Sequence, residues 1–447
     1  MSESVTGRAW LLPHMARIAR AAARIYYRIR VEGEAPPQTV PVLFVANHPN
    51  SLIDPVLVAA AADRPLRFLA KAPLFEERLV GPLMRASGSI PVYRRQDDPE
   101  LMDRNASVFE AVHSALAEGA AVGIFPEGLS HSEPSLVRLR TGAARIALGA
   151  ADRAATVVPI VPVGIVLRQK DRFRSKALVL VGSPVEWADL SGRPEDDAEA
   201  VRELTHRIED ALRDVTVNLE RIDDRAVIEC AEAVYSAELG QDRNHQERVR
   251  RTRQATEGLH ALRQQDPARA AKLVARVRGF ANSLSVLGLS PRGLEASARP
   301  RAAVGWSTRN LVYFLVGAPI AFVGHVLFFI PYQLTEWFAG RPGVPHDVRS
   351  ARKLLGGGLL YIGWCVLLAL AVGWLTGILP GVAAAVTLPL VALITLAVRE
   401  RWKDAREEVR RYFVLRRTGD VRGRLLERRR ELAEELERLR REISGEG

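Results

Sequence analysis

A histidine and an aspartate one turn further on, His48 and Asp54, are the residues of this sequence best suited to catalysis. They follow Val42–Ala46, a short apolar run with the composition of a buried strand. A histidine at a strand end, with a carboxylate to orient it, is a suitable general base. The same residues also suit a plain turn, because Asp54 and Pro55 are good starting residues for the alanine-rich helix that follows.

Three further polar motifs lie in the same part of the chain. Gly88–Arg94 places an arginine after a strand-like piece, and Phe125–Gly128 reads Phe-Pro-Glu-Gly after another apolar run. A Val-Pro-Ile-Val-Pro-Val-Gly segment follows at Val158–Gly164. Each motif alone is weak, since Phe-Pro-Glu-Gly is also an ordinary turn and an arginine is often only a solvated charge. Their order within one domain is more specific.

The segments around these motifs alternate between strand-like and helix-like patterns. Expected strands are Val42–Ala46, Arg67–Ala70, Ala121–Phe125, Val157–Ile165 and Ala177–Val181, and expected helices are Pro55–Ala62, Pro99–Glu118, Thr141–Ala150 and Glu195–Val217. This alternation predicts an α/β layered domain with a mostly parallel sheet. Sites in such sheets gather at the carboxyl ends of strands, where the polar motifs lie.

In the order and spacing of these motifs the sequence resembles the glycerolipid acyltransferase family, over roughly residues 30–220, about 40% of the chain. The family's blocks are matched by Asn47-His48 with Asp54, Gly88 with Arg94, Phe125–Gly128, and Val161-Pro162-Val163. The Asn-His-Pro-Asn-Ser-Leu-Ile-Asp-Pro stretch further resembles a fungal-type subgroup that accepts glycerol-3-phosphate or dihydroxyacetone phosphate. Two features depart from the pattern. Five residues rather than four separate His48 from Asp54, so the turn must bulge, and Arg140 stands where the family often has lysine.

The resemblance implies a mechanism without metal or prosthetic group, because a thioester already supplies an activated acyl group. His48 is expected to take the proton of an acceptor hydroxyl, with Asp54 orienting the imidazole; such help is worth about 10²–10⁴-fold. Arg94 and Arg140 are expected to bind phosphate through their planar guanidinium groups. The remaining substrate-binding residues are expected to be Asn47, Glu127 and Gly128, with Glu127 bonding an acceptor hydroxyl or holding Arg94 and its loop. Acyl-CoA or acyl-carrier protein would be the donor.

His131 is a rival catalytic histidine, with Ser130 and Ser132 beside it as alternative nucleophiles. Adjacent residues rarely converge on one atom, and no further carboxylate except Glu133 is placed as a partner. The acyl-enzyme mechanism is therefore the less favoured alternative.

The overall charge favours an acidic partner. The 447 residues carry a net charge of +11, supplied mostly by arginine. Because the chain shows no zinc-type Cys/His spacing, no RNA-recognition motif and no Gly-rich nucleotide loop, membrane and phosphate are favoured over nucleic acid. The two cysteines, Cys230 and Cys365, imply no disulfide framework.

Two long uncharged stretches predict a membrane region. Leu354–Val398 has 45 residues without a charge and divides at a Gly-Ile-Leu-Pro-Gly turn into spans of about 354–375 and 382–398. Asn310–Thr335 has 26 uncharged residues broken by proline and glycine, which predicts a re-entrant or interfacial segment. Basic residues flank the pair of spans but not their connecting loop, so both flanks and the catalytic domain are expected on the cytoplasmic side.

The ends of the chain complete the expected organisation. No signal peptide is expected, and Arg8–Val31 is a basic amphipathic segment that suits either a headgroup layer or packing on the domain. The arginine- and glutamate-rich tail is expected to be a solvated helix on anionic lipid rather than a short coiled coil. The expected parts are an N-terminal helix (1–31), a catalytic domain (32–220), a helical extension (221–303), a membrane region (304–398) and a charged tail (399–447).

The sequence thus predicts a membrane-bound O-acyltransferase that acylates glycerol-3-phosphate. The alternatives are a lysophospholipid or 1-acylglycerol-3-phosphate acyltransferase, a thioesterase using the same donor, and a non-enzymatic membrane protein that binds anionic lipid. Its expected partners are the bilayer, a phosphorylated glycerol or lysolipid acceptor and an acyl thioester, with no nucleic acid. Loss of activity in a folded His48→Ala protein would distinguish the enzyme from the binding protein.

Overall fold

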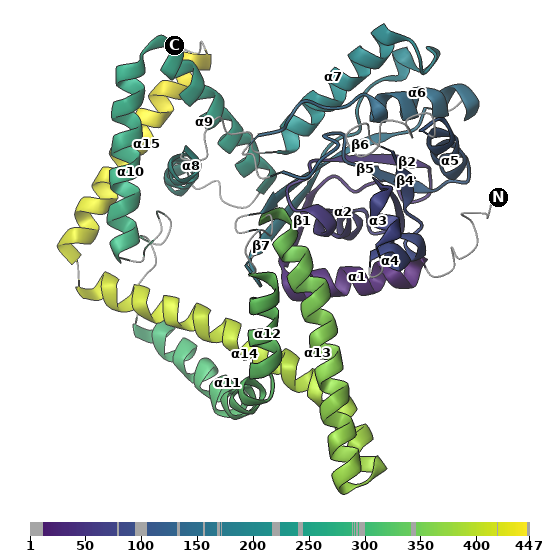
Figure 1. Ribbon diagram of the computed structural model, residues 1–447. Coiled ribbons are helices and arrows are strands. Elements are labelled where there is room, and N and C mark those ends of the chain that lie inside the picture. The colour runs from purple at the N-terminus through teal and green to yellow at the C-terminus, as the bar shows by residue number, and fades with distance from the viewer. Residues whose placement is uncertain are drawn as a thin grey trace. The chain divides into compact units, whose positions relative to one another are not determined.

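The computed structural model of the chain forms two compact units. The first contains Met1–Glu220, His245–Arg253 and Val344–Leu354, and the second contains Arg221–Asn244, Gln254–Gly343 and Leu355–Gly447. The structure describes residues 12–77, 80–93, 105–131, 135–154, 157–167, 170, 172–216, 224–239, 245–287, 289, 291, 294, 300–340, 346–417 and 419–444. Figure 1 shows the elements with their labels.

Within the described residues of the first unit, seven strands form one mostly parallel sheet. The strands are β1 (Arg28–Gly33), β2 (Val42–Ala46), β3 (Leu66–Lys71), β4 (Ile90–Val92), β5 (Ala121–Ile124), β6 (Ile160–Leu167) and β7 (Lys176–Val181). Their order is β1-β7-β6-β2-β5-β3-β4, and β6–β7 is the antiparallel pair among these neighbours. The predicted α/β fold with a mostly parallel sheet is confirmed.

Helices cover both faces of this sheet. They are α1 (Leu12–Tyr26), α2 (Asp54–Ala62), α3 (Pro73–Glu76), α4 (Val80–Ala86), α5 (Asn105–Ala117), α6 (Gly142–Ala154) and α7 (Ala198–Val215). On β2 the alternate residues Leu43 and Val45 join a core with α5, α6 and α7, while Phe44 joins a second core with α1 and α2. All five residues of β2 are buried because both faces are covered, which explains its continuous apolar sequence. Figure 1 shows the two helical layers.

The N-terminal segment differs from the helix expected over Arg8–Val31. Helix α1 ends at Tyr26, and Arg28–Gly33 forms the edge strand β1, which pairs with β7. Burial of Tyr26 and Tyr27 in the second core turns the chain into the sheet. The charged residues of this strand alternate with Ile29 and Val31, a strand pattern that the helical spacing of the preceding residues obscured.

A helical bundle forms one part of the second unit. It contains α8 (Arg225–Leu239), α10 (Pro267–Leu287) and α15 (Gly419–Ser444), and α9 (His245–Gln265) precedes α10 in the chain. The side chain of Arg429 on α15 is only 2% exposed and its Nε donates to Glu238 on α8 at 2.7 Å. Leu432 and Leu439 are also buried. The tail is therefore a packed helix, and the expectation of a solvated helix on lipid was wrong, because its leucines face α8 and α10.

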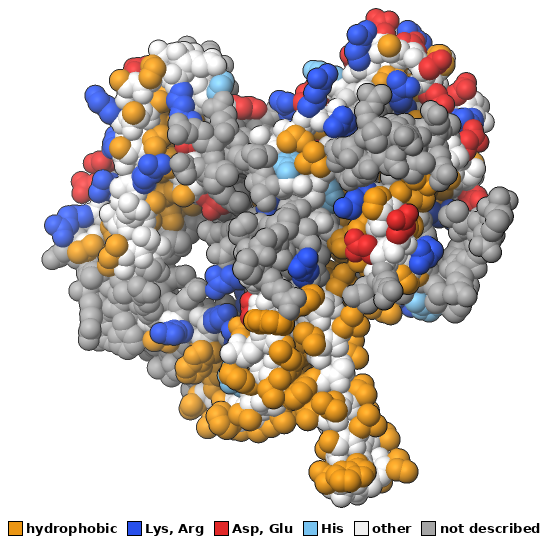
Figure 2. Space-filling view, viewed as in Figure 1, with side chains coloured by type: hydrophobic (Ala, Val, Ile, Leu, Met, Phe, Trp, Pro, Cys, Tyr) orange, Lys and Arg blue, Asp and Glu red, His pale blue; other side chains and the backbone are white. Residues whose placement is uncertain are grey.

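Apolar helices form the other part of the second unit. They are α11 (Pro300–Leu327), α12 (Phe329–Ala339), α13 (His346–Thr376) and α14 (Ile378–Arg417). By length and composition, Arg352–Thr376 and Ile378–Lys403 are two helices able to cross a membrane among the described residues. Tyr313–Leu327 and Phe329–Ala339 form a pair bent by 58°. The space-filling view shows hydrophobic side chains gathered over these helices (Figure 2).

Candidate active site

The turn after β2 accommodates the extra residue between His48 and Asp54. Ser51 adopts a positive φ of 51°, Ser51–Ile53 form a short 3₁₀ turn, and α2 begins at Asp54. This tight winding brings His48 Nδ1 to 2.8 Å from Asp54 Oδ2. The histidine and the carboxylate therefore meet although five residues separate them.

The environment of the two groups is asymmetric. The Asp54 side chain is fully buried, whereas the His48 side chain is 18% exposed and stacks on Phe125 with ring centroids 4.1 Å apart. Burial raises the pKa of Asp54, and its hydrogen bond and charge interaction with His48 oppose that rise. When the carboxylate is ionised, Nδ1–H of His48 donates to it. Nε2 then carries the lone pair and makes no hydrogen bond to a described residue.

Glu127, in the turn after β5, has a fully buried side chain. Its Oε1 accepts from the backbone N–H of His48 at 2.8 Å, and its Oε2 accepts from the N–H of Val137 at 3.1 Å and from His131 Nε2. The carboxylate thus holds the histidine turn against the loop that follows β5. Its partners in the structure are these protein groups, and the sequence-based expectation that it bonds an acceptor hydroxyl stays a prediction.

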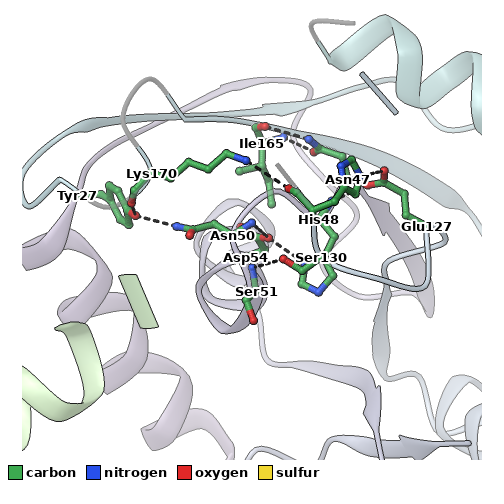
Figure 3. A network of polar contacts seen from close by, with 11 residues as sticks. Tyr27, Asn47, His48, Asn50, Ser51, Asp54, Glu127, Ser130, Ile165 and Lys170 are labelled. Carbon is green, nitrogen blue, oxygen red and sulfur yellow. Dashed lines mark hydrogen bonds and ion pairs between the residues drawn. The ribbon is translucent and has the colours of Figure 1, made fainter. Parts of the chain in front are cut away.

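The same loop holds the histidine turn through two further contacts (Figure 3). The N–H of His131 donates to the carbonyl of His48 at 3.2 Å, and the N–H of Ser51 donates to Ser130 Oγ at 3.0 Å. The rival histidine, His131, therefore has its Nε2 on Glu127, a partner that the sequence analysis did not consider. Ser130 acts as an acceptor for the backbone, and Ser132 lies outside the described residues.

The other predicted site residues have different surroundings. The Asn47 side chain bonds both backbone groups of Ile165, donating at 3.1 Å and accepting at 2.7 Å, so it connects β2 to β6. Gly128 has a φ of 72°, and a Cβ built on it would lie 3.3 Å from Arg140 Cγ. Arg140 is exposed, and no ion pair or hydrogen bond to its guanidinium occurs in the described part of the chain. Arg94 lies outside the described residues.

Three supporting residues were missed by the sequence analysis. Asn50 is fully buried, donates its N–H to Asp54 Oδ2 at 2.6 Å, and donates its amide to Tyr27 Oη at 2.8 Å. The Tyr27 hydroxyl in turn donates to the carbonyl of Lys170, whose Nζ donates to His131 O at 3.3 Å. Figure 3 shows these groups together. The asparagine within the His-to-Asp turn was a usable signal; Tyr27 and Lys170 are distant in sequence and gave none.

The described residues contain no group of three or more His, Cys, Asp or Glu side chains placed to hold a metal ion. The groups that the structure shows at this turn are an oriented imidazole, a glycine with positive φ and an exposed guanidinium.

Comparison with known proteins identifies the domain. Residues 28–166 match the family described as Acyltransferase. The match covers less than a third of the chain and is a likeness of this domain to that family. The resemblance inferred from the His48, Gly88, Phe125 and Val161 motifs is confirmed.

Relatives of the acyltransferase domain differ in the acceptor that their names give. Glycerol-3-phosphate O-acyltransferase 2 of Saccharomyces cerevisiae is 36% identical over 134 residues, 29% of this chain and 18% of the yeast protein. Lyso-ornithine lipid O-acyltransferase of Pseudomonas aeruginosa is 35% identical over 143 residues, 32% of this chain and 50% of that protein. A solved structure, the 1-acyl-sn-glycerophosphate acyltransferase of Thermotoga maritima, is 22% identical with a TM-score of 0.35, and the match covers 48% of this chain and 82% of that one. The chain thus spans half or less of the length of these two sequence relatives.

Proposed function

We propose that this protein transfers a fatty acyl group from a thioester to a hydroxyl of glycerol-3-phosphate at a membrane surface. The observation that carries the proposal is the His48–Asp54 pair, in which a buried carboxylate orients an imidazole whose Nε2 makes no bond to a described residue. The acyltransferase domain and the name of the yeast relative support the reaction class and this acceptor.

In the proposed reaction Nε2 of His48 takes the proton of the acceptor hydroxyl. The oxygen then attacks the thioester carbonyl, forming a C–O bond and a tetrahedral intermediate. Collapse of this intermediate breaks the C–S bond, and the departing thiolate receives the proton held by His48. Asp54 stabilises the imidazolium that exists between these two proton transfers.

Glu127 and the loop of His131 act as positioning groups, since they hold the backbone on both sides of the His48 side chain. Arg140, exposed beside the positive-φ turn of Gly128, is proposed to bind the acceptor phosphate together with Arg94. Asn47 is reassigned from substrate binding to holding the end of β2 against β6.

The second candidate acceptor is a lysolipid. The name of the Pseudomonas relative favours it, and the apolar helices of the second unit suit an acceptor that is itself in the bilayer. We further propose that the catalytic domain is cytoplasmic. Arg352 and Lys353 precede the first span and an arginine-rich segment follows the second, whereas the loop between them is uncharged.

The test uses the full chain in detergent or nanodiscs with palmitoyl-CoA, followed by thiol release and product mass. Acceptors are glycerol-3-phosphate, dihydroxyacetone phosphate, lysophosphatidate and lyso-ornithine lipid. Glycerol-3-phosphate is expected to give acylated product, and His48→Ala is expected to lower turnover about 10²–10⁴-fold. The control is His206→Ala, which removes an exposed histidine paired with Asp210 on α7 and should change nothing.

The other outcomes distinguish the alternatives. Thiol release without acceptor would indicate a thioesterase. Turnover only with lysolipids would assign the second candidate. No release with CoA or acyl-carrier-protein donors would favour the binding protein.

A further inference from the structure

Helices α11 and α12, which contain the segment Asn310–Thr335, carry an exposed apolar surface. Large hydrophobic side chains that are at least 49% exposed include Leu315, Val316, Phe322, Val326, Phe329 and Trp337. A group of exposed large hydrophobic side chains on a soluble protein marks an interaction site. Figure 2 shows that it is continuous with the hydrophobic surface of α13 and α14.

Helix α11 runs antiparallel to α14, from the charged end of that span toward its middle. At the charged end, Arg401 Nε donates to Asn310 Oδ1 at 2.8 Å. Further along, a Cβ built on Gly317 would lie 2.7 Å from Val398, and one built on Gly324 would lie 1.9 Å from Thr395 Oγ1. These glycines let the two helices approach closely, as small residues do in membrane bundles. The contact ends about halfway along Ile378–Lys403.

The break between α11 and α12 lies level with the middle of α13. Trp364 Nε1 donates to the carbonyl of Leu327 at 2.8 Å, and Phe328 stacks on Tyr361 with centroids 5.7 Å apart. Trp364 stands midway along Arg352–Thr376. The carbonyl of Leu327 has no helical partner because residue 331, four positions on, is a proline without an N–H. The indole satisfies this carbonyl, which is needed where no water is available.

Helix α12 then returns toward the charged end. Arg399 lies over the ring of Tyr332, 5.6 Å from its centroid. A Cβ built on Gly357 would lie 2.8 Å from Thr335 Cγ2, and one built on Gly356 would lie 3.0 Å from Phe338. Gly356 and Gly357 are near the beginning of α13, so α12 ends at the same end of the two spans at which α11 begins.

We propose that the bent pair of α11 and α12 is re-entrant and occupies a single leaflet, the one whose surface carries Arg399, Arg401 and Lys403. Its partner is the acyl-chain layer of that leaflet. The apolar part of each arm is too short to cross alone. Tyr313–Leu327 has 15 residues and covers roughly 22 Å, against about 30 Å for the hydrocarbon core, and Phe329–Ala339 has only 11 residues. The residues around Leu327 and Phe328 lie near the bilayer midplane.

The sidedness test uses single cysteines in full-length protein lacking Cys230 and Cys365, in sealed vesicles of known orientation, with a membrane-impermeant maleimide. Gly340→Cys follows α12, Arg406→Cys follows the second span, and Thr376→Cys lies at the turn between the spans. Gly340→Cys and Arg406→Cys are expected to react from the same side, and Thr376→Cys from the other. Reaction of Gly340→Cys from the side of Thr376→Cys would show that the bent pair crosses, and would overturn the proposal.

The depth test attaches a nitrobenzoxadiazole fluorophore to Phe329→Cys or Leu379→Cys in nanodiscs with brominated lipids. Bromines near the chain ends are expected to quench the label at 329 most, whereas bromines near the headgroup should quench the label at 379 most. Strongest quenching of both labels near the headgroup would overturn the midplane position and indicate either an interfacial or a spanning segment. Neither readout depends on catalytic activity, so this test stands apart from that of the proposed function.

Discussion

Two histidine–carboxylate pairs follow the neighbouring strands β2 and β5, and they distribute their hydrogen bonds differently. Asp54 uses one oxygen: Oδ2 accepts from His48 Nδ1 and from Asn50 N, while Oδ1 has no hydrogen-bond partner among the described residues. Glu127 uses both oxygens, and each accepts from a backbone N–H. Asp54 therefore orients a side chain, whereas Glu127 holds two segments of backbone.

This difference determines what replacement by an amide does. An amide has one acceptor oxygen and one NH₂ donor. At Asp54 the oxygen can take the place of Oδ2, so both bonds survive. At Glu127 either orientation of the amide sets an NH₂ group against a backbone N–H. The same chemical change should then spare the fold at one pair and damage it at the other.

The largest expected effect is that of Asp54→Asn on turnover. Without a carboxylate the imidazolium that forms during the reaction is not stabilised, so kcat should fall about 10²–10⁴-fold with the fold retained. The measurement is kcat together with thermal unfolding and circular dichroism. A large loss of melting temperature at neutral pH would instead show that the bonds of Asp54 are structural.

The pH dependence of stability sharpens this prediction. Because burial raises the pKa of Asp54, the folded state favours the protonated carboxyl. Protonation of Asp54 therefore stabilises the native protein at low pH, and this stabilisation is lost as pH rises through the folded pKa. Asp54→Asn stays neutral throughout. Its stability relative to the native protein should therefore rise from low to neutral pH, which melting curves across that range would measure. A constant difference would contradict the buried-charge argument.

Glu127→Gln should have an intermediate effect on activity and the larger effect on stability. Loss of one buried backbone hydrogen bond should lower the free energy of unfolding by about 1–3 kcal/mol, measured by denaturant titration. Displacement of the His48 backbone should reduce kcat by up to about 100-fold. Unchanged stability and activity would contradict the role assigned to Glu127.

The smallest effect is expected for His131→Ala. Val137 N still bonds Glu127 Oε2, so loss of one hydrogen bond worth about 1 kcal/mol should lower kcat about fivefold, with the KM for acyl-CoA unchanged. His131→Gln keeps a donor and should recover most of the activity. A folded His131→Ala protein as inactive as His48→Ala would make His131 the base and reverse the comparison.

Much of the fold could be predicted because its strands are buried on both faces. Val42–Ala46 coincides with β2, and the apolar runs near β5, β6 and β7 also marked real strands. The edge strand β1 was missed although its charged and apolar residues alternate, because the helical spacing of the preceding apolar residues was extended across it. The packing of α15 was missed because it depends on Arg429 meeting Glu238, a residue far away in the chain.

In the candidate site, too, contacts made within a local turn could be predicted and contacts between distant segments could not. The approach of Asp54 to His48 depends on a local turn, so it could be anticipated from a few adjacent residues. The partners of Glu127 could not, because Val137 and His131 reach it through a loop whose path depends on its contact with the His48 turn. The contacts of Asn47 could not be predicted for a related reason. Its bonds to Ile165 arise only when β6 lies beside β2.

The Asn47–Ile165 contact also bears on the order of events during synthesis. Its two residues are 118 positions apart, so the end of β2 cannot be completed until Ile165 has left the ribosome. The apolar helices follow later still, from residue 300 onward. Because N-terminal domains generally fold first as the chain emerges, the His48 turn can be assembled before the apolar helices are synthesised. A translational pause placed after β7 would then promote folding, whereas one placed before β6 would leave the His48 turn incomplete.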